Sequence, residues 1–368
     1  MMNKLVPSIG VLVLTACAST PVDPPSTPRG YDLTGSAWQT LDTEAYPGKR
    51  DDIAVVDRDR AWYGTGQGEL YATTDGGASW SLVRHQPGTF IRALAFLDDR
   101  TGFVGNIGTD YYPGVSDDTP LYRTDDGGST WTPVAVDGAP ITGVCAIDIL
   151  RTDRVFQGKL ENRMIIHAAG RVGGPTGMLR SVDGGESFTS IDLSAQAGMV
   201  LDVVFLTEFE GLVFASTGRD PASTEGLILR TEDGGESWSE VYRSGRPGEL
   251  IWKASFPTEE TGYATVMSYD PSNPQQLVLK TEDGGRTWTE LPLVENANAR
   301  QFGIGFVDER SGFVGTMAGG FQTTDGGSSW QPVPIAPAAN NFSVVEHPDG
   351  ATIWAIGTEV QKLEVERR

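Results

Sequence analysis

The sequence predicts an all-β fold, and within that class a seven-bladed β-propeller whose two chain ends meet in one blade. Three observations lead there. An eight-residue motif, Ser/Thr-x-Asp-Gly-Gly-x-Ser/Thr-aromatic, occurs six times at steps of 42 to 57 residues. Short segments of alternating apolar and polar residues flank each copy, and seven apolar segments recur with the same cadence. A repeat of this length is typical of solenoids, propellers or arrays.

The chemistry of the motif predicts a hairpin turn. Asp-Gly between two alternating segments is a strong hairpin signal, because Gly accepts the positive φ that tight turns need. The carboxylate can accept backbone N–H bonds of the turn, and the flanking hydroxyls can satisfy further turn groups. The aromatic ring supplies apolar surface to bury against a neighbouring sheet. We therefore expect structural roles for Asp75, Asp126, Asp183, Asp233, Asp283 and Asp325, and for Trp80, Trp131, Phe188, Trp238, Trp288 and Trp330.

Seven apolar segments are expected to be the first strands of the blades: 53–56, 91–96, 141–149, 200–205, 251–256, 302–306 and 342–345. After the last of them, residues 351–357 and 360–365 provide a second and a third strand without a fourth. Residues 35–41, with Trp38, resemble a fourth strand without its blade. Pairing the two ends closes a ring and removes exposed strand edges. We expect this propeller to span residues 35–368 as one domain.

The N-terminus predicts a lipoprotein. Lys4 precedes a short apolar core, and Leu14-Thr15-Ala16-Cys17 matches the lipobox, so residues 1–16 are expected to be a removable signal peptide and Cys17 the acylated N-terminus. Residues 17–34 are rich in Pro and Ser and are expected to form a tether. An ordinary secretory signal and a cytosolic start are the alternatives. Because Ala18-Ser19 lacks the Asp of inner-membrane retention, we expect attachment to the outer membrane, facing the periplasm.

Composition excludes several classes of function. With 28 basic and 49 acidic residues, the net charge of −21 repels nucleic acid and anionic lipid headgroups. The three His residues lack metal-ligand spacing, and the Gly pairs precede no phosphate-loop Lys, so we expect no metal and no cofactor. Cys145 lies in an apolar stretch and is expected to be a buried thiol. We expect a monomer.

Candidate ligand residues lie at the predicted starts of first strands and in three long loops, 106–120, 168–177 and 268–276. Long loops on a rigid scaffold commonly carry function. Strand starts point toward the central channel, so their charged side chains and one Trp form a candidate recognition patch; solvated loop charge is the alternative. The candidates are Arg50, Asp51, Asp52, Arg92, His167, Arg171, Asp202, Trp252, Lys253 and Arg300.

The six motifs resemble the Asp box, or BNR repeat, of sialidases and sortilin-type receptors. The near-regular period and the segment Ile-Arg-Ala-Leu-Ala-Phe-Leu-Asp-Asp-Arg-Thr-Gly-Phe-Val-Gly at 91–105 resemble the photosystem II stability/assembly factor family and its bacterial relatives. The resemblance implies that each Asp box joins the third and fourth strands of a blade, opposite the usual ligand face. It also implies non-catalytic binding of membrane-protein assembly intermediates.

The sequence therefore favours a non-catalytic envelope lipoprotein that binds a protein or peptide partner. A glycoside hydrolase of the sialidase or xyloglucanase type is the alternative, and it would need two separated carboxylates among Asp51, Asp52 and Asp202. The Phe/Tyr-Arg-Ile-Pro segment of sialidases is absent, and Phe90-Ile91-Arg92 is only a distant echo of it. A purely structural adhesion or envelope protein is a third possibility.

Overall fold

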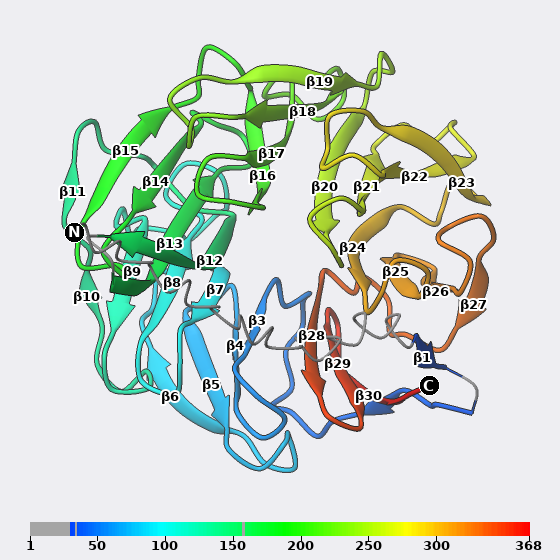
Figure 1. Cartoon of the computed structure of the whole chain (residues 1–368), viewed down its shortest axis with the longest axis horizontal. Helices are drawn as coiled ribbons and strands as arrows, with labels where there is room; N and C mark the ends of the chain where they lie inside the picture. The colour runs from blue at the N-terminus through cyan, green and yellow to red at the C-terminus, as the bar shows by residue number, and fades with distance from the viewer. Residues whose placement is uncertain (1–29, 34, 157–158) are drawn as a thin grey trace, which may run out of the picture.

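The computed structural model describes residues 30–33, 35–156 and 159–368. All regular structure in these ranges is β, with thirty strands in seven sheets. Figure 1 shows the sheets following one another around a circle, each with one edge strand toward the centre. The all-β prediction is confirmed. The predicted signal peptide and Cys17 lie outside the described residues.

Five sheets each hold four strands that are consecutive in sequence and pair antiparallel. Their strands are β3 (Ile53–Val55), β4 (Ala61–Gly64), β5 (Glu69–Thr73) and β6 (Ser81–His85); β7 (Ile91–Phe96), β8 (Gly102–Asn106), β9 (Leu121–Thr124) and β10 (Thr132–Pro133); β16 (Met199–Phe205), β17 (Gly211–Ser216), β18 (Gly226–Thr231) and β19 (Ser239–Arg243); β20 (Glu249–Ser255), β21 (Gly262–Ser268), β22 (Gln275–Thr281) and β23 (Thr289–Glu295); and β24 (Gln301–Phe306), β25 (Gly312–Thr316), β26 (Gly319–Thr323) and β27 (Gln331–Val333).

The two remaining sheets have five strands. One contains β12 (Ala146–Phe156), β13 (Lys159–Gly170), β14 (Gly177–Ser181) and β15 (Phe188–Asp192), with β11 (Val136–Asp137) added in parallel to β15. The other contains β28 (Asn341–His347), β29 (Gly350–Ile356) and β30 (Val360–Arg367), with β1 (Tyr31–Asp32) and β2 (Gln39–Thr40) both on β30.

The third sheet differs from the expected strand boundaries. We expected its first strand at 141–149, whereas β12 begins at Ala146 and forms a long hairpin with β13. A continuous apolar stretch does not fix where a strand begins, because it lacks the alternation that marks a pleated surface. The preceding sheet ends in the two-residue β10 at Pro133, whose ring nitrogen has no hydrogen to donate to the ladder.

Packing between neighbouring sheets forms the core. Tyr263 in β21 stacks on Phe306 in β24 at 3.6 Å between ring centroids, and Trp330 meets the edge of the same Phe306 ring at 6.2 Å. Trp238 and Phe205 repeat the edge contact at 6.3 Å. Aromatic pairs in these orientations add to the free energy gained by burying their area. Trp330 and Trp238 thus pack on a ring of their own sheet. Two other motif residues join one sheet to the next, as expected: Trp288 meets Phe214 edge to face at 6.0 Å, and Phe188 meets Phe103 at 5.9 Å.

Each of the six Asp-Gly-Gly turns connects the third and fourth strands of its sheet through the same hydrogen bonds. The Ser or Thr hydroxyl donates to the Asp carboxylate at 2.7–2.8 Å and accepts the N–H of the second Gly at 2.8–3.0 Å. The carboxylate also accepts the hydroxyl of the second Ser/Thr, as from Ser237 to Asp233. Both glycines have positive φ, for example 75° at Gly234 and 96° at Gly235.

The chain ends meet at the last sheet. In β2, Gln39 pairs with Lys362 and Thr40 with Gln361 of β30. Trp38 contacts Phe313 at 5.2 Å and Phe342 at 6.2 Å, edge to face. Tyr31 and Asp32, which we expected within the tether, form β1 beside the C-terminal end of β30. No helix long and apolar enough to cross a membrane occurs among the residues that the structure covers.

Candidate functional site

Six residues at or just before the starts of four first strands lie near one another, on the inner side of the circle of sheets. We call Lys49, Asp51, Arg92, Trp252, Lys253 and Arg300 the axial cluster. Asp51 links the first two sheets, because it accepts a hydrogen bond from Lys49 and its carboxylate oxygen lies 3.2 Å from Arg92 Nη1. The structure brings five of the candidate ligand residues together, and Lys49, which also precedes a first strand, lies beside them.

Arg92 is the most enclosed cation of the axial cluster. Its side chain is 2% exposed, yet neither Nη1 nor Nη2 makes a hydrogen bond within the described part of the chain. The nearby Asp51 oxygen is thus close enough for an ion pair but is not aligned as an acceptor. The guanidinium lies over the Trp252 ring at 5.2 Å from its centroid. Arg92 keeps unused donors beside an aromatic face.

Trp252 is held in place by an Asn from the last sheet. Its Nε1 donates to Asn340 Oδ1 at 2.9 Å, and Asn340 Nδ2 donates to the Asp51 carbonyl oxygen at 2.7 Å. The indole also meets the Phe302 ring edge to face at 6.1 Å. Asn340 therefore connects Trp252 with the backbone of Asp51 through buried hydrogen bonds.

Positive charges gather on one side of the axial cluster. Lys49 Nζ and the Arg300 guanidinium both lie 5.5 Å from the centroid of Phe302, and Arg300 also lies 4.9 Å from that of Tyr269. Burial, followed by the charges of Arg92, Lys253 and Arg300, lowers the pKa of Lys49 well below its usual value. Cations that depress one another's pKa favour a negative ligand.

The long loop after β8 places aromatic rings beside the axial cluster. Phe90 stacks on Tyr112 at 4.7 Å, and Tyr111 meets Tyr112 edge to face at 4.7 Å. Burial raises the pKa of Tyr112 to about 12, against the opposing charge of Arg92. Tyr112 is still 39% exposed, so this ring presents a surface above the axial cluster.

Arg171 and Arg50, two of the predicted ligand residues, bond to backbone carbonyls. Arg171 Nη1 donates to the carbonyl oxygens of Ile107 and Thr109, which fixes the start of the loop after β8. Arg50 donates to the Thr358 and Glu44 carbonyls at 2.8 and 2.6 Å. These hydrogen bonds engage the Nη atoms of Arg50 and one Nη of Arg171, whereas the Nε atoms of both side chains are buried without a partner among the described residues.

His167 lies in the interface between two sheets. It is fully buried, stacks on Phe205 at 3.4 Å, and has Nδ1 3.4 Å from Asp148 Oδ2. Burial lowers its pKa, with the Asp148 hydrogen bond opposing that effect. The structure does not bring His167 to the axial cluster.

Asp52 and Asp202 each accept a backbone N–H from the first strand of the next sheet. Asp52 Oδ2 accepts Leu94 N at 2.7 Å, and Asp202 Oδ2 accepts Ala254 N at 2.9 Å. The other Asp202 oxygen lies 3.1 Å from Lys253 Nζ. Burial raises the pKa of Asp52, and the Lys253 charge and three hydrogen bonds oppose it. With their oxygens engaged, these carboxylates are poorly placed for acid–base work on a sugar.

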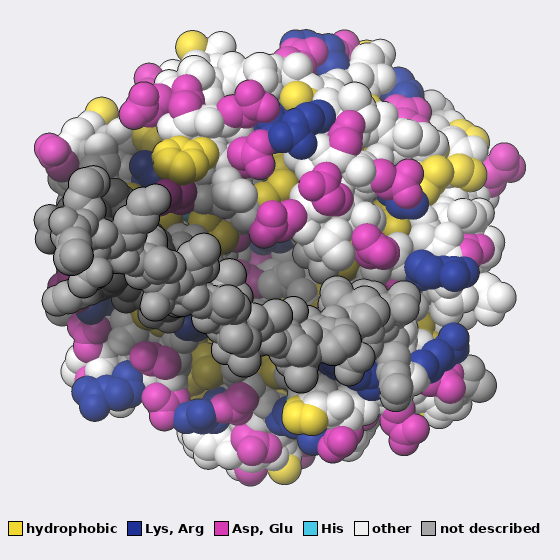
Figure 2. Space-filling view, viewed as in Figure 1, with side chains coloured by type: hydrophobic (Ala, Val, Ile, Leu, Met, Phe, Trp, Pro, Cys, Tyr) yellow, Lys and Arg dark blue, Asp and Glu magenta, His cyan; other side chains and the backbone are white. Residues whose placement is uncertain are grey.

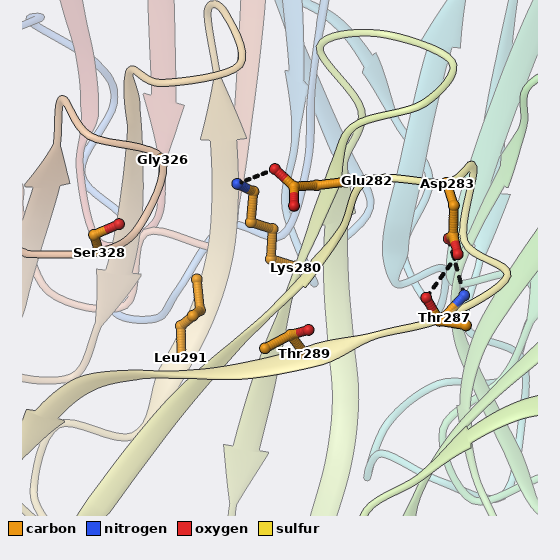
Figure 3. Close-up of a pocket in the computed structure, with 8 residues that line it drawn as sticks. All are labelled: Lys280, Glu282, Asp283, Thr287, Thr289, Leu291, Gly326 and Ser328. Carbon is orange, nitrogen blue, oxygen red and sulfur yellow. Dashed lines mark hydrogen bonds and ion pairs between the residues drawn. The ribbon is translucent and has the colours of Figure 1, made fainter.

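Two hollows lie elsewhere, beside the Asp-Gly-Gly turns. Figure 3 shows the first, about 300 Å³, with the Lys280–Glu282 ion pair and the Asp283 turn on its border. The second, about 960 Å³, lies between β1, the β24–β25 turn and the C-terminus. Both are lined by residues already paired within their turns or strands. Among the described residues, no group of three or more His, Cys, Asp or Glu could hold a metal ion.

The sequence analysis did not single out four residues of this region: Phe302, Tyr269, Asn340 and Asn341. Asn340 and Asn341 stand at the start of β28, where Arg92 stands in β7. The rule that strand starts face the centre would have found them, had it been applied to amides as well as to charges.

No protein-family model and no curated protein matches the chain. Solved structures do. YCF48 bound to D1 peptide is 15% identical with a TM-score of 0.59, covering 94% of this chain and 100% of its own. The GH74 enzyme of Niastella koreensis is 16% identical with a TM-score of 0.57, and the match covers 90% of this chain but 58% of the enzyme. The WD40 β-propeller domain of Doa1 is 12% identical with a TM-score of 0.56, covering 91% and 97%. These likenesses show the fold: the chain is a β-propeller.

Proposed function

We propose that this protein is a non-catalytic, lipid-anchored propeller of the bacterial cell envelope that binds a protein or peptide partner. Binding occurs on the face that carries the axial cluster. The observation that carries the proposal is Arg92, a buried guanidinium with unused donors beside Trp252, below the exposed Tyr112 ring. Aromatic and Arg side chains with unmet polar groups are typical anchors for a partner.

The comparisons support the binding role by analogy of fold. The structure of YCF48 has been solved with a D1 peptide bound, and this peptide is a ligand of YCF48. A propeller of similar extent can therefore hold a peptide. The resemblance of this sequence to the photosystem II stability/assembly factor family points the same way, and the acidic charge suits a partner with basic regions around its anchor.

We further propose that the seven sheets are seven blades of a closed ring and that the six turns are Asp boxes. Contacts and pairing at the last sheet support this proposal. β28 contacts β24 on one side and β3 on the other, and β2 pairs with β30. In an Asp-box propeller, the ligand face lies opposite the turns, and the axial cluster does lie at the strand starts, away from the third–fourth strand turns.

The lipid anchor is a proposal from the sequence. Acylation at Cys17 would place the propeller at the outer membrane, facing the periplasm. Replacing Cys17→Ala should abolish the mass added by the lipid and release the protein from washed membranes. Unchanged membrane retention of an unacylated protein would contradict the anchor while leaving the binding role intact.

The hydrolase alternative is disfavoured by the engaged carboxylates of Asp52 and Asp202. The likeness to the GH74 enzyme extends to the fold only. If the chain were nevertheless a hydrolase, turnover of an aryl-glycoside panel would be lost in the variant Asp202→Asn, and we expect no turnover to begin with.

Photo-crosslinking in intact cells tests the binding face. A photoreactive phenylalanine analogue would replace Tyr112, 39% exposed above the axial cluster, or Phe209, 55% exposed in the β16–β17 turn on the opposite face. We expect a discrete adduct with an envelope protein from position 112 and none from 209. Adducts from 209 alone, or from neither position, would contradict the proposed face.

A further inference from the structure

The axial cluster is locally cationic in an acidic protein. Four of its six members are cations and one is a carboxylate, while the whole chain has a net charge of −21. Figure 2 shows many Asp and Glu side chains around the rim of one face of the molecule. Asp202 neutralises Lys253 at 3.1 Å, which leaves Asp51 shared between Lys49 and Arg92. Arg300 forms no ion pair with a carboxylate among the described residues, so positive charge is left over on its side of the axial cluster.

Unmet donors accompany that charge. Both Nη atoms of Arg92 and the Nε of Arg300 are buried without a hydrogen-bond acceptor among the residues described. A buried polar group left without a partner costs about 1–3 kcal/mol, and more when the group is charged. The guanidinium presents its N–H groups in a planar fork, which matches the two oxygens of a carboxylate.

Apolar side chains from three sheets and from the segments that connect the sheets surround these donors. Trp252, Phe302, Met267, Leu250, Met199, Leu201, Val172, Cys145, Ile107 and Ala338 form one cluster, with Phe90, Tyr111 and Val115 packed against it. An environment of this kind strengthens charge pairing because it excludes water. It also favours an organic anion over a hydrated inorganic one, since apolar ligand groups would contact the rings.

We propose that the axial cluster binds a carboxylate carried by an extended peptide segment, with the carboxylate on Arg92 and an adjacent aromatic or apolar side chain against Trp252 and the Tyr111–Tyr112 loop. This inference rests on the proposed function and specifies its ligand chemistry. The chain end and the side chain of Asp or Glu are the two sources of such a carboxylate. The loop after β8 borders the axial cluster, and its Tyr112 is 39% exposed.

Calorimetric titration with short peptides tests this ligand chemistry. The probes are acetyl-Ala-Ala-Phe with a free carboxylate, its C-terminal amide, and the amides of acetyl-Ala-Glu-Phe and acetyl-Ala-Gln-Phe. We expect the free acid or the Glu peptide to bind at least tenfold more tightly than its neutral counterpart. Whichever pair shows the difference identifies the source of the carboxylate. Equal binding within both pairs would overturn the proposal.

Substitutions in the axial cluster test which residues produce the preference for the carboxylate. Arg92→Gln should abolish the preference for the carboxylate. Arg300→Gln should reduce it severalfold. Because the Arg300 side chain makes ring contacts but no hydrogen bond in the described structure, that variant is expected to fold even if Arg92→Gln does not. The matched control Arg100→Gln removes an exposed guanidinium bonded only to the Asp125 carbonyl oxygen. A preference that is undiminished in both Arg92→Gln and Arg300→Gln, or is lost in Arg100→Gln, would contradict the site.

The result is separable from the proposed function. If the carboxylate preference is absent but position 112 still crosslinks a partner in cells, the binding face stands and the ligand chemistry is wrong. If peptides bind as expected but no cellular adduct forms at 112, the ligand chemistry proposed for the axial cluster stands, and the proposal of an envelope partner is wrong.

Discussion

At the scale of single residues, the six repeated aspartates work as acceptors inside their own turns. In Asp75, Asp126 and Asp233 the hydroxyl of the second Ser/Thr is the largest influence on the pKa, followed by a backbone N–H. These bonds lower the pKa of each carboxyl to about 2. The motif thus needs an ionised Asp for structural reasons, which explains its repetition without invoking catalysis.

An acid titration follows from those pKa values. Because the folded-state pKa of these carboxyls, about 2, lies below the usual value of 3.8, the ionised form stabilises the fold above pH 4. That contribution is lost as the pH falls from about 4 to 2. We expect the melting temperature to fall steeply over this interval and less steeply in Asp233→Asn. The control Asp349→Asn should follow the unaltered protein, and identical curves for all three would contradict this role.

The hydroxyl that opens each turn is equally testable. Thr231 is 1% exposed, donates to Asp233 at 2.8 Å and accepts the N–H of Gly235 at 2.9 Å. Thr231→Val removes the acceptor of a buried N–H, so we expect a loss of about 1–3 kcal/mol in the free energy of unfolding. In the control Thr289→Val, at an exposed strand position, the change should stay within about 0.5 kcal/mol. Urea unfolding measures both, and equal effects would argue against the turn network.

At the scale of elements, side chains of one first strand accept N–H groups of the next. Asp52, Asp148, Asp202 and Ser255 accept from Leu94, Phe205, Ala254 and Phe306 at 2.7, 3.3, 2.9 and 3.0 Å. These hydrogen bonds hold neighbouring sheets in a fixed relation at their inner edges. Two residues that sequence reasoning assigned to ligand binding therefore also position the sheets that carry the axial cluster.

Removing one such acceptor should be costly. Asp202→Ala leaves the buried Lys253 ammonium and the Ala254 N–H without their partner, so we expect a loss of about 3–5 kcal/mol of stability. The control Glu282→Ala breaks the surface pair with Lys280 and should cost about 0–1 kcal/mol. Adding Lys253→Met to Asp202→Ala should recover part of the loss. No difference between Asp202→Ala and Glu282→Ala in denaturant unfolding would contradict the role of Asp202.

The sequence predicted those parts of the fold whose chemistry is local. The six turns could be recognised because hydroxyl, carboxylate and Gly–Gly lie within five residues of one another, as around Asp233. The parallel β11 was missed because Val136 pairs with Phe188, 52 positions away. The β12–β13 hairpin is local, and it was missed because polar runs such as 151–154 and 161–163 interrupt the alternation that marks a strand. Asp52 could not be separated from a ligand residue for the same reason: the N–H that it accepts, from Leu94, lies 42 positions away.

At the scale of the whole molecule, the axial cluster depends on the meeting of the two chain ends. Asn340, just before β28, bonds to the Asp51 carbonyl oxygen, and Asn341 donates to Asp52. Arg50 donates to Thr358 in the turn between β29 and β30. If β2 did not lie on β30, Lys49 and Asp51 would lose their fixed place beside Arg92.

The central claim is that the two chain ends pair in one sheet, and a designed disulfide between β2 and β30 tests it most directly. Gln39 and Lys362 are directly paired, and the Cα separation of paired antiparallel residues, about 4.5–5.5 Å, suits a disulfide. In a Cys17→Ser background, with buried Cys145 the only other thiol, Gln39→Cys with Lys362→Cys should oxidise to an intramolecular bond and raise the melting temperature. The off-register pair Gln39→Cys with Glu364→Cys should remain reduced. Oxidation of the off-register pair instead, or of neither, would contradict a ring closed by β2 on β30.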